Sequence, residues 1–352
     1  MKILFVNHSI RRCGVYQYGL AAFDAIQKID SLEMKMVEVN NKESLSKEIF
    51  LFNPDTVVYN YHPVTLPFIT SSLLAPFRSC LHVGLVHRLN QDQADSLGEN
   101  SLFDFYIMGD PTLVERNPRV FKIGRIIPFY ENNYPIPQIP TIGSFGFAGS
   151  SKGFERLVDL VKRDFDQAII KINIPPNSFI DPNNKWLNYF VTSQSQKLKG
   201  SNIELQVSTE FFSENELLNF LAKNSINVFP YPTWKRKVDF GGISSAVDQA
   251  IAARRPVAIS RCSLFRHLLQ LNPSIVIDQS INKWNFFTSW FDKNTNGKSL
   301  KEIQHNGIEP LKPLYELFSE NTFIARFKQI LTQIEDQRES ILGGLKKFSH
   351  LG

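Results

Sequence analysis

The sequence predicts an α/β protein made of two domains, each built on a sheet of parallel strands. At 352 residues the chain is longer than a single hydrophobic core usually supports. Short apolar runs alternate with segments of helical spacing, as in parallel sheets whose strands are connected by helices. The stretch ENNYPIPQIP at 131–140 has three prolines in ten residues and is interpreted as a stiff interdomain linker. A long surface loop within one domain is the alternative interpretation.

The first part of the chain contains five strand candidates separated by helical segments. KILFV at 2–6 is a short apolar run that ends in polar residues, which is typical of a strand buried in a parallel sheet. Further strands are predicted at 34–39, 56–61, 80–87 and 103–110, and helices at 18–29, 41–52 and around 66–74. We therefore expect residues 1–130 to form the N-terminal domain.

The alternation restarts after the proline-rich segment and predicts a C-terminal domain over 141–312. Ser213 and Glu216 have the spacing of a capping box, which marks the start of a helix at 213–224. The remaining elements predicted here are strands at 143–149, 167–174, 203–208, 227–231, 256–260 and 274–278, and helices at 152–165 and 245–253. The tail at 313–352 is mostly helical in pattern and is a candidate to pack back on the N-terminal domain.

Composition narrows the class of protein further. A net charge of +5 and a pI near 8.9 permit a phosphate-bearing ligand or contact with an anionic membrane surface, whereas no nucleic-acid partner is expected. The basic stretch 234–238 (WKRKV) is the candidate for such peripheral membrane contact. Cys13, Cys80 and Cys262 form no CxxC pair, so neither a disulfide framework nor a metal site is expected.

The start of the chain and its apolar runs favour a cytoplasmic location. The apolar run after Met1 is too short for the hydrophobic region of a signal peptide, and no run of 18 apolar residues is present. A reducing compartment also fits the unpaired cysteines. We therefore expect a cytoplasmic protein, with peripheral contact at the inner face of the membrane as an additional hypothesis.

Two loops of the second domain carry the pattern of an anion site. In open α/β sheets, ligands bind beyond the carboxyl ends of the strands, so the loops after the strands are where chemistry is expected. The stretch GGISS at 241–245 combines flexible glycines with serines that can cap a helix, whose free N–H groups favour phosphate. In the second loop, at 147–154, Ser150 and Ser151 can cap the next helix, and Lys152 is expected in its first turn. A lysine there opposes the helix dipole unless a diphosphate is bound. The alternatives are a well-capped helix after a flexible loop and a solvated lysine.

Three strand ends in the first domain carry cationic or imidazole side chains. The loop at 7–19 holds His8 and the adjacent Arg11 and Arg12, a pair that suits an anionic group. His62 and His87 each end a predicted strand, where an imidazole can bond a sugar hydroxyl or act as a base. A solvated or purely structural role is the alternative for each of them.

Taken together, these stretches resemble the GT-B glycosyltransferases, and within them the retaining, group 1 (family 4-like) enzymes that use nucleotide sugars. The strongest parts of the resemblance are FGFAGSSKGFERLVDLV and GGISSAVDQAIAARRPVAIS. The resemblance implies two Rossmann-like domains that face each other across a cleft. It also implies transfer of a sugar from a UDP- or GDP-sugar to a hydroxyl of a glycan or lipid-linked acceptor. Retention of configuration, and action without a metal or a further cofactor, are implied as well.

The resemblance also implies roles for individual residues. Lys152 and Gly153 match the Lys-Gly of the family, and the Gly14-Val15 loop matches the glycine loop that faces the reaction centre. Implied donor-binding residues are Gly149, Ser150, Ser151, Lys152, Gly242, Ile243, Ser244, Ser245 and Gln249. Implied catalytic residues are His87, Lys152 and Asp239, and implied sugar- or acceptor-facing residues are His8, Arg11, Arg12, Gly14, Val15 and His62.

One departure from the family pattern keeps other functions open. The family carries two glutamates eight residues apart, and their positions here hold Gly241 and Gln249. A catalytically weakened GT-B protein that binds a sugar nucleotide or glycan as a partner subunit is therefore the first alternative. A nucleotide-sugar epimerase on the same fold is the second, although acid–base residues are few. A two-domain protein that binds small anions is the third.

Overall fold

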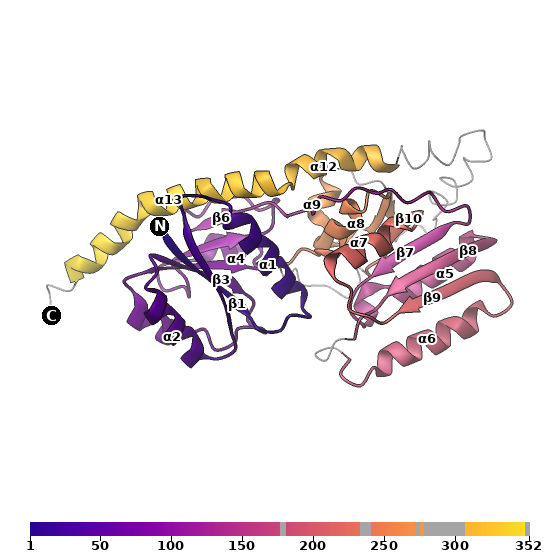
Figure 1. Cartoon of the computed structure of the whole chain (residues 1–352), viewed down its shortest axis with the longest axis horizontal. Helices are drawn as coiled ribbons and strands as arrows, with labels where there is room; N and C mark the ends of the chain where they lie inside the picture. Colours follow the sequence, from indigo (N-terminus) through magenta and orange to yellow (C-terminus); the bar gives the residue numbers. More distant parts are fainter. Residues whose placement is uncertain (177–180, 233–240, 272–274, 278–306, 349–352) are drawn as a thin grey trace. The chain divides into compact units, whose positions relative to one another are not determined.

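The structure is a computed structural model that describes residues 1–176, 181–232, 241–271, 275–277 and 307–348 (Figure 1). The chain forms two compact units. The N-terminal unit comprises Met1–Ile126, Phe240–Gly242 and Phe318–Gly352, and the C-terminal unit comprises Ile127–Asp239 and Ile243–Leu317. The expected catalytic Asp239 and the basic stretch 234–238 lie outside the described residues.

The N-terminal unit is built on a sheet of parallel strands in the order β2-β1-β3-β4-β5-β6. Its strands are β1 (Lys2–His8), β2 (Glu33–Val39), β3 (Thr56–Tyr61), β4 (Leu81–Val86), β5 (Phe105–Met108) and β6 (Val120–Lys122). The central strands β3 and β4 are almost wholly buried, because helices cover both faces of the sheet. This explains why they read as continuous apolar runs in the sequence.

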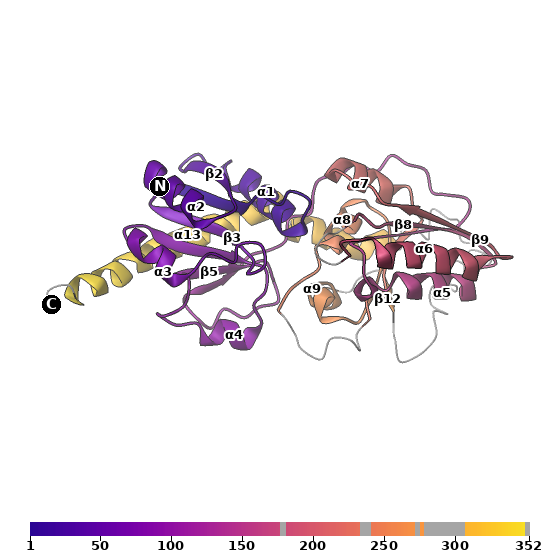
Figure 2. The ribbon, with the colours of Figure 1, turned by 90° about the horizontal axis from the view of Figure 1, so that it is seen from below.

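Two layers of helices cover the faces of this sheet (Figures 1 and 2). One face packs against α1 (Gly14–Ile26) and the long C-terminal helix α13 (Glu320–Phe348). The opposite face packs against α2 (Lys42–Phe52), α3 (Ser71–Leu74) and α4 (Gln91–Ser96). Asn41 caps α2 by accepting a hydrogen bond from the Ser44 amide at 2.8 Å, which fixes where that helix begins.

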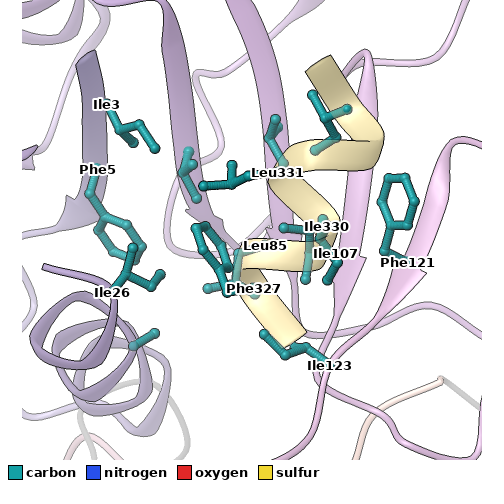
Figure 3. Packing of buried hydrophobic residues seen from close by; sticks show 14 of the residues in the cluster. Ile3, Phe5, Ile26, Leu85, Ile107, Phe121, Ile123, Phe327, Ile330 and Leu331 are labelled. Carbon is teal, nitrogen blue, oxygen red and sulfur yellow. The ribbon is translucent and has the colours of Figure 1, made fainter. Parts of the chain in front are cut away.

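Helix α13 supplies part of the core of the N-terminal unit. Phe327, Ile330 and other apolar residues on one stripe of the helix are buried against the sheet, beside Leu85 and Ile107 (Figure 3). Polar contacts fasten the same helix, since Arg326 Nε donates to the carbonyl oxygen of Lys122 at 3.0 Å. The chain therefore completes the core of its first unit only with its last helix.

The C-terminal unit repeats the architecture with the strand order β12-β11-β10-β7-β8-β9, again with every pair parallel. Its strands are β7 (Thr141–Phe145), β8 (Gln167–Asn173), β9 (Asn202–Ser208), β10 (Ile226–Phe229), β11 (Val257–Ser260) and β12 (Ile275–Ile277). Together with the first sheet, this arrangement confirms the predicted α/β fold with two Rossmann-like units.

Helices cover both faces of the second sheet as well (Figure 2). Helices α5 (Phe154–Asp164) and α6 (Lys185–Leu198) share a core with Val228 on one face. The neighbouring Asn227 points to the other face, where its amide donates to the carbonyl oxygen of Leu221 at 3.2 Å. Leu221 belongs to α7 (Glu214–Ala222), which packs against α8 (Ala246–Ala252). Two further short helices are α9 (Arg266–Leu269) and α12 (Lys312–Leu317).

The proline-rich segment at 131–140 is fastened to the C-terminal unit. The guanidinium of the buried Arg255 donates to the carbonyl oxygens of Tyr134 and Pro135 at 2.8 and 3.0 Å, and also to that of Ala222. Asn132 adds a side-chain bond to the carbonyl oxygen of Ala253 at 2.9 Å. The stretch predicted as a linker is thus held along one unit by hydrogen bonds, and the chain changes unit between Ile126 and Ile127.

The packing of α13 generates a stability prediction. Phe327→Ala removes a fully buried ring from the core of the N-terminal unit, so we expect the free energy of unfolding to fall by about 3–5 kcal/mol. Urea denaturation followed by circular dichroism measures the change. Phe50→Ala is the matched control, because Phe50 lies on α2 with 78% of its surface exposed. Equal losses in the two variants would contradict the assignment of α13 to this core.

Candidate functional site

The strand ends of the C-terminal sheet bring three loops together around Lys152, Tyr231 and Ser244. These residues follow β7, follow β10 and precede α8, respectively. Because all strands are parallel, the ends of neighbouring β7 and β10 lie at the same edge of the sheet. The structure therefore places Lys152 and Ser244, predicted as donor-binding, in one cluster, and it adds Tyr231, which the sequence did not single out.

Gly153 makes this meeting of loops possible. Its backbone has φ +74°, in the left-handed region that favours glycine. A Cβ at this position would collide with the backbone carbonyl oxygen of Pro230. The loop after β7 thus packs directly on the chain that leaves β10. This close approach carries Lys152 to Tyr231.

The ammonium of Lys152 is held by Tyr231. Lys152 Nζ donates to Tyr231 Oη at 3.0 Å and also lies 4.6 Å from the centre of the ring, within cation–π range. Tyr231 Oη lies in turn 3.3 Å from Ser244 Oγ. The aliphatic part of Lys152 passes over Gly146, where an added Cβ would lie 3.3 Å from Lys152 Cδ and Cε. One cation and two hydroxyl groups therefore form a continuous polar chain.

Hydrogen bonds and ring packing fix the backbone around this cluster. Ser260, at the end of β11, donates through Oγ to the carbonyl oxygen of Tyr231 at 2.7 Å. The Ser244 amide donates to the carbonyl oxygen of Leu264 at 3.0 Å. The Tyr231 ring packs against Phe265, with ring centres 4.8 Å apart. Such supports hold a polar group in one geometry before any ligand binds.

The predicted capping of the flanking helices is wrong in two details. Helix α5 starts at Phe154 with Gly153 at its N-cap, so Lys152 precedes the helix, and neither Ser150 nor Ser151 occupies the cap. Ser245 is the N-cap residue of the seven-residue α8, but its backbone is helical and its side chain makes no capping bond. The left-handed turn at Gly153 delays α5, which removes the expected conflict between Lys152 and the helix dipole.

The other predicted donor-binding residues lie in the segments that flank this cluster, with the exception of Gly242. Gly149 ends the loop after β7 with φ 140°, and Ile243 precedes Ser244. Gln249 lies in α8 and is half-buried. Gly242 is grouped with the N-terminal unit.

The strand ends of the N-terminal sheet form a second polar cluster, centred on Asn60. Asn60 Nδ2 donates to the Val15 carbonyl oxygen at 2.7 Å and to Asn7 Oδ1 at 2.8 Å. A carbonyl oxygen can only accept, so the orientation of the Asn60 amide is fixed and its Oδ1 faces His87 Nε2 at 2.6 Å. Nε2 must then carry the proton of the neutral imidazole. His87 Nδ1 is left with a lone pair that can accept a hydrogen bond.

His87 is held uncharged by its surroundings. Burial lowers the pKa of His87 to about 3, and the nearby Arg125, His62 and His8 contribute in the same direction. Tyr18 packs edge-on against the imidazole, with ring centres 5.1 Å apart. His87 is therefore a neutral hydrogen-bonding group at physiological pH.

His8 and His62 are held in the same tautomer by backbone amides. The Nδ1 atom of each accepts a backbone amide hydrogen, from Ile10 at 3.1 Å and from Val64 at 3.2 Å, so each neutral ring carries its proton on Nε2. Burial lowers the pKa of both imidazoles, and His62 reaches about 4 with help from Arg88 and His8. Both side chains are more than nine-tenths buried, and His8 Nε2 has no protein partner within the described chain. The strand ends of β1, β3 and β4 thus present neutral imidazoles.

The two arginines predicted in the first loop differ in their surroundings. Arg11 pairs with Glu38 at 3.1 Å, and Tyr16 donates to the same carboxylate at 2.7 Å, which lowers the pKa of Glu38. Arg12 is exposed at the loop surface. Gly14 begins helix α1, and Val15 contributes its carbonyl oxygen to Asn60. Arg11 is therefore already neutralised locally, whereas Val15 acts as part of the scaffold.

Within the described residues, no group of three or more His, Cys, Asp or Glu side chains is arranged to hold a metal ion. Among the helices that the structure describes, none is both long and apolar enough to cross a lipid bilayer.

Solved structures share this fold over nearly the whole chain. Sucrose-phosphate synthase from Thermosynechococcus elongatus is 12% identical with a TM-score of 0.67, over 96% of this chain and 99% of that one. A glycosyltransferase from Rickettsia africae is 13% identical with a TM-score of 0.65, over 95% and 98%. Anabaena HepE in complex with UDP-glucose is 11% identical with a TM-score of 0.65, over 96% and 100%.

These neighbours are GT-B glycosyltransferases, so the predicted GT-B fold is confirmed. No protein-family model matches the sequence, and no curated protein matches it in sequence. At such low identities the neighbours establish the architecture of the chain, while its chemistry has to be argued from its own residues.

The approach of Gly153 to Pro230 predicts the cost of adding one methyl group. We expect Gly153→Ala to lower the melting temperature more than Gly200→Ala does, and to weaken any ligand bound at Lys152. Both glycines have left-handed backbones, at φ +74° and +81°, but a Cβ at Gly200 meets nothing within 4 Å. The shared backbone strain costs about 1–2 kcal/mol, so the difference between the variants isolates the collision. Thermal denaturation with equal losses would contradict the close packing.

The Asn60–His87 bond predicts the tautomer and charge of an imidazole. Nitrogen NMR should show His87 as the Nε2–H tautomer, neutral across pH 5–8, because its pKa is about 3. A folded pKa below the unfolded value means that protonation favours unfolding, so this contribution to stability falls as the pH drops below about 6.5. Asn60→Ala should allow either ring nitrogen of His87 to carry the proton. The control Asn173→Ala, at a strand end of the other sheet, should leave the Nε2–H tautomer unchanged. Titration of wild-type His87 near 6.5 would refute this account.

Proposed function

We propose that this chain is a glycosyltransferase that moves a sugar from a UDP-sugar to a hydroxyl group of an acceptor. The observation that carries the proposal is the Lys152–Tyr231–Ser244 cluster at the strand ends of the C-terminal unit. An ammonium and a hydroxyl group at such an edge suit the oxygens of a diphosphate. Structures of HepE with the same fold were solved with UDP or UDP-glucose bound, which supports a uridine nucleotide as the ligand.

The chemistry proposed for the donor site is stabilisation of a leaving diphosphate. The bond between the sugar C1 and the phosphate oxygen breaks, and negative charge grows on the diphosphate. Lys152 and Ser244 would stabilise that charge in the transition state, which is the role a metal ion has in other transferases. We propose that transfer proceeds with retention and without a metal, through attack on the same face. The acceptor hydroxyl forms the new bond to C1, and its proton passes to the leaving phosphate oxygen.

The N-terminal unit is proposed to bind the acceptor and orient the sugar. His87 offers a lone pair on Nδ1 and can accept a hydrogen bond from a hydroxyl group. The neutral imidazoles of His8 and His62 suit uncharged hydroxyl groups. A glycan or lipid-linked acceptor, used in the cytoplasm or at the inner membrane face, fits this chemistry.

A binding protein without turnover is the second candidate function. The observation that favours it is the absence of a carboxylate at Gly241 and Gln249, where the resembling family carries glutamates. A glycan-binding or nucleotide-sugar-binding partner subunit would keep the diphosphate site and lose the reaction. Incubation with UDP- and GDP-sugars plus acceptor extracts distinguishes the two, because only the enzyme releases nucleotide and labelled glycan. Release that persists in EDTA supports catalysis without a metal.

The donor site predicts a specific loss of nucleotide affinity. We expect Lys152→Ala to weaken UDP binding by about 1–3 kcal/mol, because a charge-assisted contact to the diphosphate is lost. Calorimetric titration with UDP measures the change. Lys223→Ala is the matched control, because Lys223 Nζ also lies over a tyrosine of the same unit, 4.9 Å from the Tyr134 ring. The assignment fails if both variants bind UDP as wild type does, or if wild type itself does not bind.

A further inference from the structure

Tyr231 occupies a place in the C-terminal unit that packing alone does not require to be polar. Its side chain is 1% exposed and its ring packs against Phe265 and Phe229, which a phenylalanine could do equally well. The hydroxyl group, by contrast, reaches two polar side chains from two other loops. Burying a hydroxyl group destabilises the fold unless the group is hydrogen-bonded. The hydroxyl group of Tyr231 therefore calls for a role that the ring alone does not fill.

The chemistry of the partners fixes the direction of the Lys152–Tyr231 bond and allows the phenol to donate onward. An ammonium group can only donate, so Tyr231 Oη accepts from Lys152 Nζ at 3.0 Å. The phenolic hydrogen is then available to Ser244 Oγ, 3.3 Å away. When Ser244 Oγ accepts that hydrogen, its own hydroxyl hydrogen is turned outward. The order of donors from Lys152 through Tyr231 to Ser244 is the one that leaves the Ser244 hydrogen for a ligand, and it forms part of the proposal below.

We propose that Tyr231 is a positioning residue, which orients the Ser244 hydroxyl as a hydrogen-bond donor to the diphosphate of the nucleotide. This inference rests on the proposed function of the Lys152 site. Diphosphate oxygens only accept hydrogen bonds, so a serine hydroxyl is useful to them only when its hydrogen points toward them. The Lys152 charge at the start of the chain polarises each following bond and strengthens it.

The same arrangement holds the rest of the site in register. The Tyr231 carbonyl oxygen is bonded to Ser260 and the Ser244 amide to Leu264, so each backbone is held by a residue at or just after the end of β11. Only the hydroxyl hydrogens remain to be ordered, and the phenol orders one of them. Loss of the ordered hydroxyl hydrogen should therefore lower the affinity for a bound anion and leave the stability of the fold unchanged. This difference separates a positioning role from a structural one.

A double-mutant cycle on UDP affinity tests the proposal. Tyr231→Phe keeps the ring and removes the hydroxyl, and Ser244→Ala removes the proposed donor. We expect each single variant to weaken UDP binding about 3- to 10-fold, the range of one net hydrogen bond. Because the two act through the same donor, the double variant should be little weaker than either single one. Calorimetric titration gives the affinities, and melting temperatures without ligand should stay close to the wild-type value.

Tyr130→Phe is the matched control for loss of a tyrosine hydroxyl. Tyr130 lies in the same unit and donates to Asn219 Oδ1 at 2.8 Å, away from the Lys152 cluster. It should bind UDP as wild type does. Wild-type UDP affinity in Tyr231→Phe overturns the inference, as do fully additive losses in the double variant. In either case a Lys152→Ala defect would still support the nucleotide site. Absence of UDP binding in the wild-type chain would overturn the inference and the proposed function together.

Discussion

The parallel direction of every strand pair is the constraint on which both candidate sites depend. In a parallel sheet all carboxyl ends lie at one edge, so residues far apart in sequence meet there without any further device. Lys152 and Tyr231 are 79 residues apart and share a hydrogen bond. Asn7, Asn60 and His87 meet in the same way, across β1, β3 and β4. The polar residues are therefore assembled by the sheet itself.

The two clusters differ in charge, since one offers neutral imidazoles and the other an ammonium group. In the N-terminal unit, burial and neighbouring cations hold His62 and His87 uncharged, so this edge offers neutral donors and acceptors. In the C-terminal unit, Lys152 brings an ammonium group to the strand ends, and Tyr231 holds it. Neutral imidazoles suit hydroxyl groups, whereas an ammonium suits phosphate oxygens. This division of chemistry is the physical basis of the proposed roles of acceptor side and donor side.

The sequence predicts most strands because burial on both faces leaves a continuous apolar run, and Ser213 caps α7 through the predicted box with Glu216. It misses the three-residue strand β6 and the whole of α6, whose apolar residues are mixed with polar ones. Single residues whose role depends on non-local hydrogen bonds carry no spacing signal. Tyr231 stands in a plain FPYP stretch, and Asn60 differs from its neighbours only by being polar within a buried strand. A polar residue in an apolar strand is the signal that could have found Asn60.

Helix α8 shows why the stretch after GGISS is rich in alanine. Ala250, Ala252 and Ala253 are almost fully buried, so small side chains let this short helix and its end lie close to the sheet. Its start follows Ser244 of the Lys152–Tyr231–Ser244 cluster. Two hydrogen bonds form at its end, since Tyr315 donates to the Ile251 carbonyl oxygen at 3.0 Å and Asn132 donates to that of Ala253 at 2.9 Å. A larger residue in α8 would displace these contacts together, since seven residues span only about 10 Å. The small side chains of α8 thus support contacts at both termini of the helix, and no local sequence pattern links those contacts.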